Sequence, residues 1–148
     1  KNYKKLPATV RGTTFMFNII GLDKEHDRLS LVGCNSTTVG RYLTQILPKL
    51  GYKVSLYNSV TQIKPREFAH QDFVISCTGS PHLINKSHFS KSSVCFCVDL
   101  GCEVVENKVV GDFDTDIKDI PGILYTNAVG KITTLCLLLN LLDTYEEV

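Results

Sequence analysis

The chain has 148 residues, of which 43% are hydrophobic and 21% charged, and its formal net charge is +1. This balance is typical of a globular domain with a sizeable core and excludes an intrinsically disordered chain. A net charge so close to zero gives no reason to expect nucleic acid or an anionic membrane as partner. No apolar run reaches the roughly 20 residues that span a bilayer. We therefore expect one globular domain over residues 1–148.

The N-terminal segment, residues 1–22, predicts a helix that enters this domain. Its apolar stretch covers residues 9–20, and a charged connection follows at 22–27. The only methionine is Met16, and the chain begins with Lys1. Because a native start normally carries methionine or a small residue after its removal, we expect the C-terminal part of a longer polypeptide.

Strand and helix signals alternate along the next hundred residues. Apolar residues at helical spacing predict a helix over residues 38–50, with Pro48 weakening its last turn and Gly51 following its end. Short apolar runs predict strands at 29–33, 53–57, 72–76, 93–98 and 123–125. Strands separated by helices or crossover-length segments build a parallel sheet. We predict an α/β fold, Rossmann-like and doubly wound, with helices on both faces of a mostly parallel sheet.

The last segment, residues 130–147, predicts a long C-terminal helix. Residues 132–142 leave almost no polar face, and a helix that is apolar all round is normally buried on all sides. Two arrangements would bury it: a place between the sheet and another layer, or packing against a domain or subunit absent from this chain. We expect the isolated chain to associate, through residues 132–142 or a sheet edge.

The six cysteines do not form a disulfide or zinc pattern. Cys77, Cys95, Cys97 and Cys136 lie in apolar runs, where free cysteine behaves as a small hydrophobe. There is no Cys-x-x-Cys pair. We therefore expect a reducing compartment, the cytoplasm, with the mitochondrion left open.

The first strand ends at Gly33, and small polar residues follow it before the helix. Glycine permits a tight turn, and the backbone N–H groups of residues 34–36 together with the helix N-terminus suit a phosphate. The segment is neither Gly-x-Gly-x-x-Gly nor a P-loop. By itself it is a weak signal, because a glycine that ends a strand is more often only a turn.

Three later strand ends carry similar residues. They are Asn58-Ser59-Val60-Thr61, Cys77-Thr78-Gly79-Ser80 and Asp99-Leu100-Gly101. Ligands of open α/β sheets bind at the carboxyl ends of the strands, so four such ends together predict a nucleotide cleft. The second end lacks the acid that often holds the ribose of NAD, which favours a 2′-phosphate and hence NADP.

No catalytic or metal-binding constellation is recognisable. The four histidines are scattered, and Asp112, Asp114, Asp116 and Asp119 lack the glycine and terminal glutamate of an EF-hand. We expect a solvated acidic loop there. The sequence predicts no metal site and no catalytic residue in this chain.

Seven short motifs stand in order along nearly the whole chain. They are Pro7-Ala-Thr9-Val-Arg-Gly12, Val32-Gly33 to Val39-Gly40, Asn58 to Thr61, Thr78-Gly79-Ser80-Pro81, Asp99-Leu-Gly101, Val110-Gly111-Asp112-Phe-Asp114 and Asn127-Ala-Val129-Gly130-Lys-Ile-Thr133. This order resembles the C-terminal, NAD(P)-binding half of bifunctional methylenetetrahydrofolate dehydrogenase/methenyltetrahydrofolate cyclohydrolase. Cys34 stands where that family commonly has an arginine that meets the cofactor phosphate.

The resemblance implies a domain that binds NADP, with NAD possible, in one-carbon folate metabolism. Catalytic residues and the folate site would lie in an N-terminal domain absent here, so this chain alone is expected to be inactive, and a homodimer is implied. The implied cofactor-binding residues are Gly33, Cys34, Asn35, Ser36, Ser59, Thr78, Gly79, Gly101, Cys102 and Thr133. The implied substrate-side loop comprises Asn127, Ala128, Val129 and Gly130.

Two other classes stay open on the sequence. The first is a degenerate, non-catalytic homologue that serves as a nucleotide-binding or interaction module. The second is another two-domain dehydrogenase of the shikimate type, which the order Val-Gly-Asp-x-Asp and then Val-Gly-x-x-Thr fits poorly.

Overall fold

The computed structural model describes residues 6–36, 38–127 and 129–146. The chain divides into two compact units, one formed by residues 1–22 with 128–148 and the other by residues 23–127. Each unit is described by itself. In the described parts of the chain, no helix is both long and apolar enough to cross a membrane.

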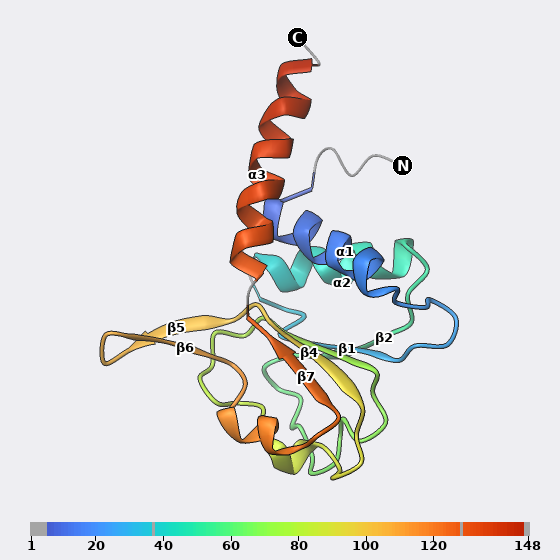
Figure 1. The fold of residues 1–148 in the computed structure, drawn as a ribbon, viewed down its shortest axis with the longest axis vertical. Helices are drawn as coiled ribbons and strands as arrows, with labels where there is room; N and C mark the ends of the chain where they lie inside the picture. The colour runs from blue at the N-terminus through green and yellow to red at the C-terminus, as the bar shows by residue number, and fades with distance from the viewer. Residues whose placement is uncertain (1–5, 37, 128, 147–148) are drawn as a thin grey trace. The chain divides into compact units, whose positions relative to one another are not determined.

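The larger unit is built on a five-stranded, wholly parallel sheet (Figure 1). Its order is β2-β1-β3-β4-β7, and its strands are β1 (Leu29–Val32), β2 (Val54–Tyr57), β3 (Phe73–Ser76), β4 (Cys95–Asp99) and β7 (Ile123–Thr126). At the carboxyl edge, Val32 pairs with Tyr57 on one side and with Ser76 on the other. The predicted parallel α/β sheet is therefore confirmed.

Helical segments cover both faces of this sheet. The helix α2 (Val39–Lys49) makes the crossover from β1 to β2 and buries Leu43 and Leu47. Two short 3₁₀ helices, η2 (Lys86–His88) and η3 (Thr115–Asp119), lie on the side opposite α2 (Figure 1). Only the β1–β2 connection within this unit holds an α-helix among the described residues; the others cross over through loops and 3₁₀ turns.

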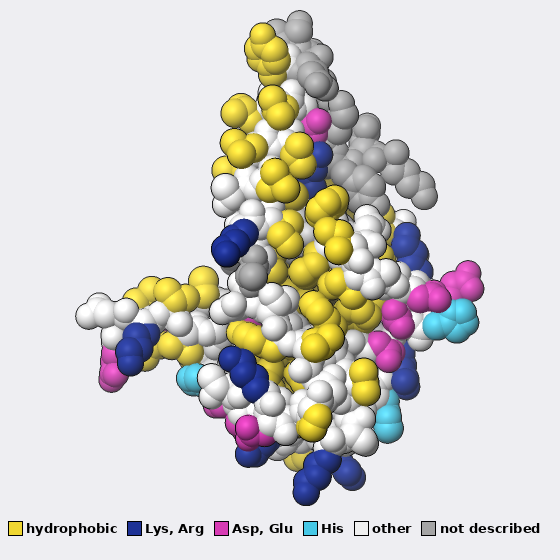
Figure 2. Space-filling model, in the orientation of Figure 1, with side chains coloured by type: hydrophobic (Ala, Val, Ile, Leu, Met, Phe, Trp, Pro, Cys, Tyr) yellow, Lys and Arg dark blue, Asp and Glu magenta, His cyan; other side chains and the backbone are white. Residues whose placement is uncertain are grey.

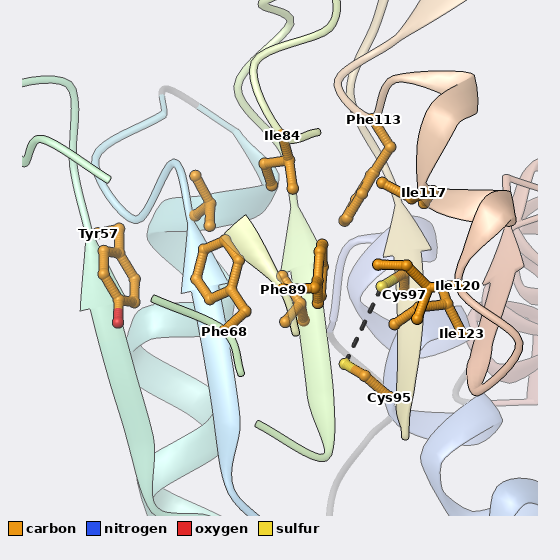
Figure 3. Close-up of a cluster of buried hydrophobic side chains, with 12 residues drawn as sticks. Tyr57, Phe68, Ile84, Phe89, Cys95, Cys97, Phe113, Ile117, Ile120 and Ile123 are labelled. Atoms are coloured by element: carbon orange, nitrogen blue, oxygen red, sulfur yellow. Dashed lines mark hydrogen bonds between the residues drawn. The ribbon is translucent and has the colours of Figure 1, made fainter. Parts of the chain in front are cut away.

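The main core lies on the sheet face turned away from α2 (Figure 3). Side chains alternate along each strand, so Val32 and Val74 enter this core while Leu31 and Ile75 are buried on the opposite face. The core comprises Val32, Tyr57, Phe68, Val74, Ile84, Phe89, Cys95, Cys97, Phe113, Ile117, Ile120 and Ile123. Residues from the irregular connections thus fill the space that a crossover helix would otherwise occupy.

All six cysteines are free thiols, as the sequence predicts. Cys95 and Cys97 point to the same face of β4, and their sulfur atoms lie 4.0 Å apart within the core. They behave as small apolar side chains there.

A protruding β-hairpin was not predicted from the sequence. Its strands β5 (Cys102–Val105) and β6 (Lys108–Gly111) form a separate antiparallel pair. Glu106 and Asn107 make the turn with φ angles of 49° and 62°. A two-residue turn with two positive φ angles usually contains glycine, as in Asn-Gly, and this glycine is what predicts the hairpin from sequence. The turn at Glu106 and Asn107 has no glycine.

The smaller unit is a pair of helices, α1 (Ala8–Ile20) and α3 (Val129–Glu146), that pack against each other. They approach closely at Gly12, where an added Cβ would lie 3.1 Å from Ile132 Cγ2. Arg11 donates hydrogen bonds to the side chains of Asn140 at 2.6 Å and Asp143 at 2.8 Å. The two helices predicted at the ends of the sequence are confirmed.

The helix α3 is not enclosed, because most of its leucines are exposed and form part of the apolar surface in Figure 2. The expectation of a place between the sheet and another layer concerns two separate units of the chain and stays a prediction. The exposed side chains are Leu135, Leu137, Leu138, Leu139, Leu141, Leu142 and Tyr145. Packing against a domain or subunit absent from this chain stays a prediction.

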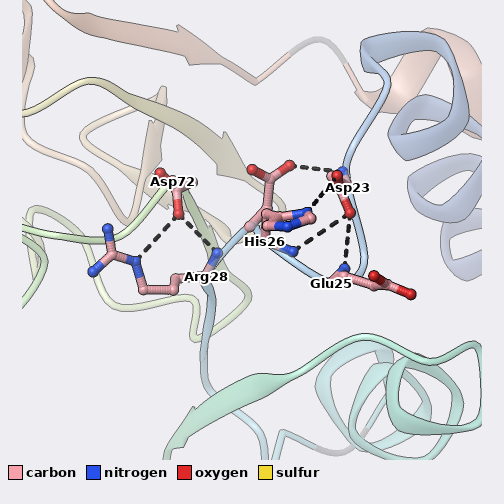
Figure 4. Close-up of polar contacts among 6 residues, drawn as sticks. Asp23, Glu25, His26, Arg28 and Asp72 are labelled. Carbon is pink, nitrogen blue, oxygen red and sulfur yellow. Dashed lines mark hydrogen bonds and ion pairs between the residues drawn. The ribbon is translucent and has the colours of Figure 1, made fainter.

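Polar contacts hold the amino-terminal edge of the sheet (Figure 4). The Asp72 carboxylate accepts the Arg28 backbone N–H at 2.8 Å, and the Arg28 carbonyl in turn accepts the N–H of Asp72. Nearby, Asp23 accepts hydrogen bonds from the Glu25 N–H and the His26 ring, and these bonds lower the pKa of Asp23. Exposed pairs of this kind contribute little to stability. They fix the loop into β1 at the edge opposite the carboxyl ends.

Candidate functional site

A cleft of about 670 Å³ opens at the carboxyl ends of the parallel strands. The sheet order places β1 between β2 and β3, so the chain reverses its direction of winding there, and ligands of open α/β sheets bind at such a reversal. The volume lies within the range of small-molecule and cofactor sites. The lining residues are Val32, Gly33, Asn35, Ser36, Asn58, Ser59, Thr61, Gln62, Ile63, Thr78, Ser80, Leu83 and His88.

The turn after β1 forms one wall of the cleft. Gly33 has a φ of 88°, a conformation that favours glycine, and an added Cβ would lie 3.0 Å from Thr78 Cγ2. The N–H groups of Gly33 and Cys34 both donate to the Tyr57 carbonyl, at 2.8 and 3.1 Å. This turn therefore bends sharply between the ends of β2 and β3.

The N-terminus of α2 lies directly against this turn. Ser36 Oγ accepts the N–H of Gly40 at 3.0 Å. An added Cβ on Gly40 would collide with the Gly33 carbonyl and lie 2.9 Å from Cys77 Sγ. Burial raises the pKa of the Cys77 thiol to about 12, so this side chain is a neutral packing group behind the turn. The two glycines allow helix and turn to approach closely.

The end of β2 forms the second wall. Asn58 Oδ1 accepts the N–H groups of Val60 and Thr61, at 3.0 and 3.1 Å, in a tight polar turn. The Asn35 side-chain amide donates to Ser59 Oγ at 3.1 Å. The first and second strand ends are thus joined across the cleft.

The end of β3 forms the third wall, through the loop from Thr78 to Ser80. The Asp112 carboxyl group accepts the N–H of Thr78 at 2.7 Å and that of Ser80 at 2.9 Å. It also accepts the Ser76 hydroxyl at 2.6 Å. Asp112 is fully buried. The expectation of a solvated acidic loop is therefore wrong at Asp112, because the backbone donors of a neighbouring loop solvate its carboxyl group instead of water.

A second aspartate, Asp99 at the end of β4, is also buried. It accepts the N–H groups of Asp112 and Phe113 and the Tyr125 hydroxyl, the last at 3.1 Å. Burial raises the pKa of the Asp99 carboxyl group, and the backbone hydrogen bonds oppose that rise. The end of β4 is therefore tied to the segment that carries Asp112.

The cleft lining carries no Lys, Arg, Asp or Glu among its described residues. Its one titratable residue is His88, which is buried and whose Nδ1 accepts the N–H of Asn85 at 3.1 Å. Burial lowers the pKa of His88, and a ring whose Nδ1 accepts carries its proton on Nε2. The wall of the cleft is consequently neutral at pH 7.

Half of the predicted cofactor-binding residues converge on the cleft. Those that line it are Gly33, Asn35, Ser36, Ser59 and Thr78. Four others lie next to the strand ends without lining it: Cys34, Gly79, Gly101 and Cys102. Thr133 belongs to α3 in the other unit. Whether these residues hold a cofactor stays a prediction.

Gly101 has a packing role of its own. An added Cβ at this position would collide with the Asp112 carboxyl group. Its glycine is therefore required by the buried aspartate, whatever the cleft binds.

The predicted substrate-side loop falls into three parts. Asn127 follows β7 and is exposed, while Val129 and Gly130 begin α3. Ala128 lies outside the described residues.

Sequence reasoning missed several lining residues. Gln62, Ile63, Leu83 and His88 come from irregular segments between strands, where neither periodicity nor a glycine marks a residue as facing the cleft. As for metals, the described part of the chain holds no group of three His, Cys, Asp or Glu side chains arranged to bind an ion.

The parallel sheet, its reversal at β1 and the glycine turn define a Rossmann-like α/β domain. The profile of the tetrahydrofolate dehydrogenase/cyclohydrolase, NAD(P)-binding domain family matches residues 7–148. The chain belongs to this family, and the resemblance seen in the sequence is confirmed.

Its relatives are about twice as long. The chain is 30% identical over 150 residues to the bifunctional protein FolD of Aquifex aeolicus, covering 96% of this chain and 49% of the relative. It is 28% identical to FolD of Mycoplasma capricolum, with 95% and 50% covered. The chain thus spans about half the length of the curated relatives it matches.

Solved structures agree on the fold. The bifunctional 5,10-methylenetetrahydrofolate dehydrogenase/cyclohydrolase of Thermoplasma acidophilum is similar with a TM-score of 0.79 at 26% identity, over 95% of this chain and 51% of that one. The Trypanosoma brucei enzyme, solved with NADP cofactor and inhibitor, shares the fold with a TM-score of 0.79 at 20% identity, over 99% of this chain and 52% of that one.

Proposed function

We propose that this chain is the cofactor-binding half of a NADP-dependent 5,10-methylenetetrahydrofolate dehydrogenase/5,10-methenyltetrahydrofolate cyclohydrolase of one-carbon folate metabolism. The observation that carries the proposal is the cleft at the β1 reversal, lined by the turn at Gly33 and by small polar side chains. Relatives that share the family are bifunctional enzymes of this kind.

The residues present fit a dinucleotide. Gly33, Cys34, Asn35 and Ser36 would form the turn against the pyrophosphate, beside the N-terminus of α2. The N–H groups of Gly33 and Cys34 donate to the Tyr57 carbonyl and that of Ser36 donates to the Gly33 carbonyl, so the Asn35 N–H is the backbone donor of this turn that would meet a phosphate oxygen. Ser59 would meet the adenosine phosphate, and Thr78 and Gly79 the cofactor between its two ends. Gly101, Cys102 and Thr133 would lie at the nicotinamide end. The cofactor supplies the hydride chemistry, and the part played by this chain is to bind and orient it.

Folate chemistry would need residues from outside this chain. Asn127, Ala128, Val129 and Gly130 would form the side of the site that faces the folate, and the catalytic groups would come from the N-terminal half. We therefore expect this chain alone to bind cofactor without turnover.

The non-catalytic alternative is not favoured. The relatives reported above are bifunctional enzymes, and the cleft is open rather than filled by side chains. An assay of the longer polypeptide that carries this domain separates the two readings: dehydrogenase activity supports the enzyme, and cofactor binding without turnover supports the alternative.

Titration of NADPH into the intact chain, followed by its fluorescence, tests cofactor binding. We expect a saturable signal that NADP⁺ displaces. Gln62→Trp, which puts bulk into the cleft, should abolish it, whereas Lys91→Trp on an exposed loop outside the cleft should not. No saturable response of the wild-type chain at about millimolar NADPH, a concentration that detects binding free energies of only about −4 kcal/mol, would remove the proposal.

We also propose a homodimer, located in the cytoplasm or mitochondrion. Two exposed apolar surfaces support association: the leucines of α3, and Val104, Val105 and Val109 on the β5–β6 hairpin (Figure 2). Exposed apolar patches of this kind commonly mark protein contacts. Sedimentation velocity of Leu138→Glu and Val109→Lys variants tests both surfaces, and a monomeric wild-type chain would contradict the dimer.

A further inference from the structure

The Thr78–Ser80 loop is held by a residue that comes more than thirty positions later in the chain. Its two N–H groups, from Thr78 and Ser80, donate to opposite oxygens of the Asp112 carboxyl group, at 2.7 Å to Oδ2 and 2.9 Å to Oδ1. Thr78 and Ser80 both line the cleft, and Asp112 does not. The carboxyl group therefore acts on the cleft only through the loop.

We propose that Asp112 is a positioning residue for the cofactor cleft: it fixes the Thr78–Ser80 loop in the shape that receives the cofactor. The inference rests on the proposed function, since it names the residue that prepares one wall of that site.

The chemistry of the contact requires a carboxyl group. Three donors converge on Asp112: two loop N–H groups and the Ser76 hydroxyl. An ionised carboxylate has two acceptor oxygens and no donor, whereas an asparagine amide has one acceptor and one donor group. In Asp112→Asn, whichever way the amide turns, its NH₂ group faces at least one loop N–H.

The surrounding residues hold Asp112 itself in place. Asp99 Oδ1 accepts the Asp112 N–H at 3.2 Å, and the Asp112 carbonyl accepts the Ile84 N–H at 2.9 Å. Gly101 supplies the space that the carboxyl group occupies, because a Cβ there would collide with it. Asp112 is thus held through its own backbone N–H and carbonyl, and the N–H is held by Asp99 at the end of β4. A carboxyl group held in this way can fix another loop.

The competing explanation is that Asp112 only stabilises the fold. The first part of the proposal is that the Thr78–Ser80 loop is held in place, and amide hydrogen exchange on the wild-type chain without cofactor tests it. Loop amides at a cleft wall normally exchange fast with solvent. Because the amides of Thr78 and Ser80 donate to Asp112, we expect their exchange to be at least about 100-fold slower than in an unstructured peptide. Exchange at the unstructured rate would overturn the proposal, and this test does not depend on any variant folding.

Two matched variants test the second part of the proposal, that the held loop strengthens cofactor binding. Asp112→Asn disturbs the loop bonds, and Ser76→Ala removes one hydrogen bond to the same carboxyl group while leaving both loop amides paired. We expect Asp112→Asn to raise the NADPH dissociation constant at least about tenfold, since hydrogen bonds to charged groups are among the stronger ones. Ser76→Ala should change it less than about threefold, although it too lowers the melting temperature.

Equal dissociation constants for Asp112→Asn and Ser76→Ala, each measured well below its melting temperature, would show that Asp112 only stabilises the fold. If the wild-type chain binds no NADPH, the proposed function fails, while the exchange rates still show whether the Thr78 and Ser80 amides are held. If Asp112→Asn does not fold, exchange of these amides in the wild-type chain at the unstructured rate would still overturn the proposal.

Discussion

The side-chain amide of Asn35 donates a hydrogen bond to Ser59 Oγ at 3.1 Å, and this bond joins the ends of β1 and β2 across the cleft. Both residues are exposed and both line the cleft. An exposed neutral hydrogen bond adds at most about 1 kcal/mol to stability. Its consequence should therefore appear in ligand affinity rather than in folding.

Replacing Asn35 tests this view. Asn35→Ala should weaken NADPH binding by roughly 3- to 10-fold, equivalent to the loss of one hydrogen bond, with little change in melting temperature. Asn35→Asp can keep the bond by accepting from Ser59, yet its charge would repel a phosphate, so we expect a larger loss. Fluorescence titration measures both variants, and wild-type affinity in Asn35→Asp would show that no phosphate binds near this residue.

The close approach of α2 to the turn at Gly33 predicts that adding one methyl group at Gly40 lowers stability markedly. Gly40→Ala should destabilise the chain by about 1–3 kcal/mol, because its Cβ meets the Gly33 carbonyl and cannot be accommodated without moving the backbone. Gly130→Ala is the matched control, since nothing lies within 4 Å of its added Cβ and alanine favours a helix. Urea denaturation compares them, and equal stabilities would contradict the close contact.

The sheet was predictable because each of its strands is a short apolar run followed by a turn residue. The hairpin was not, because Val104, Val105 and Val109 are exposed and the turn at Glu106 and Asn107 lacks glycine. Exposed valines in a protruding arm give no alternation between a buried and a solvated face, so the periodicity that reveals a half-buried strand is absent.

The site was predictable at the strand ends and nowhere else. Gly33 and Thr78 were found because parallel strands deliver their carboxyl ends to one edge. Gln62 and His88 reach the same cleft from irregular connections, and Asp112 reaches it through a buried carboxyl group whose donors lie more than thirty residues earlier. Local sequence carries no trace of such long-range pairing.

The burial of His88 predicts a pH dependence of stability. Its folded pKa lies below the unfolded value of about 6.5, so as the pH falls through 6.5 the unfolded state takes up a proton that the folded state resists. Stability should fall between about pH 7 and pH 5, by about 1.4 kcal/mol for each unit by which the two values differ. His88→Gln should flatten this dependence.

His70→Gln is the control for that experiment, because His70 is exposed and the same substitution there removes a histidine from the surface. Asp99 acts in the opposite direction: its raised pKa means that acidification towards 3.8 relieves the cost of burying its charge. Denaturation midpoints across this pH range decide the matter, and a loss of stability that survives in His88→Gln would rule out His88 as its source.

The neutral lining predicts weak discrimination between the two nicotinamide cofactors. The described lining offers no fixed cation to a 2′-phosphate, so the wild-type chain should prefer NADPH to NADH by less than about tenfold, the ratio that 1.4 kcal/mol would give. Gln62→Arg adds a cation to the cleft wall, and an exposed ion pair of up to about 1 kcal/mol should raise that preference by up to about fivefold.

The added preference in Gln62→Arg should shrink at high salt, because ions screen an exposed pair, whereas Gln62→Met should leave the ratio unchanged. Paired titrations of NADPH and NADH at low and high ionic strength measure these ratios. A wild-type preference above about 100-fold, worth some 2.7 kcal/mol, is more than hydroxyl and amide groups in this cleft supply, and would place a cation from another part of the protein on the phosphate.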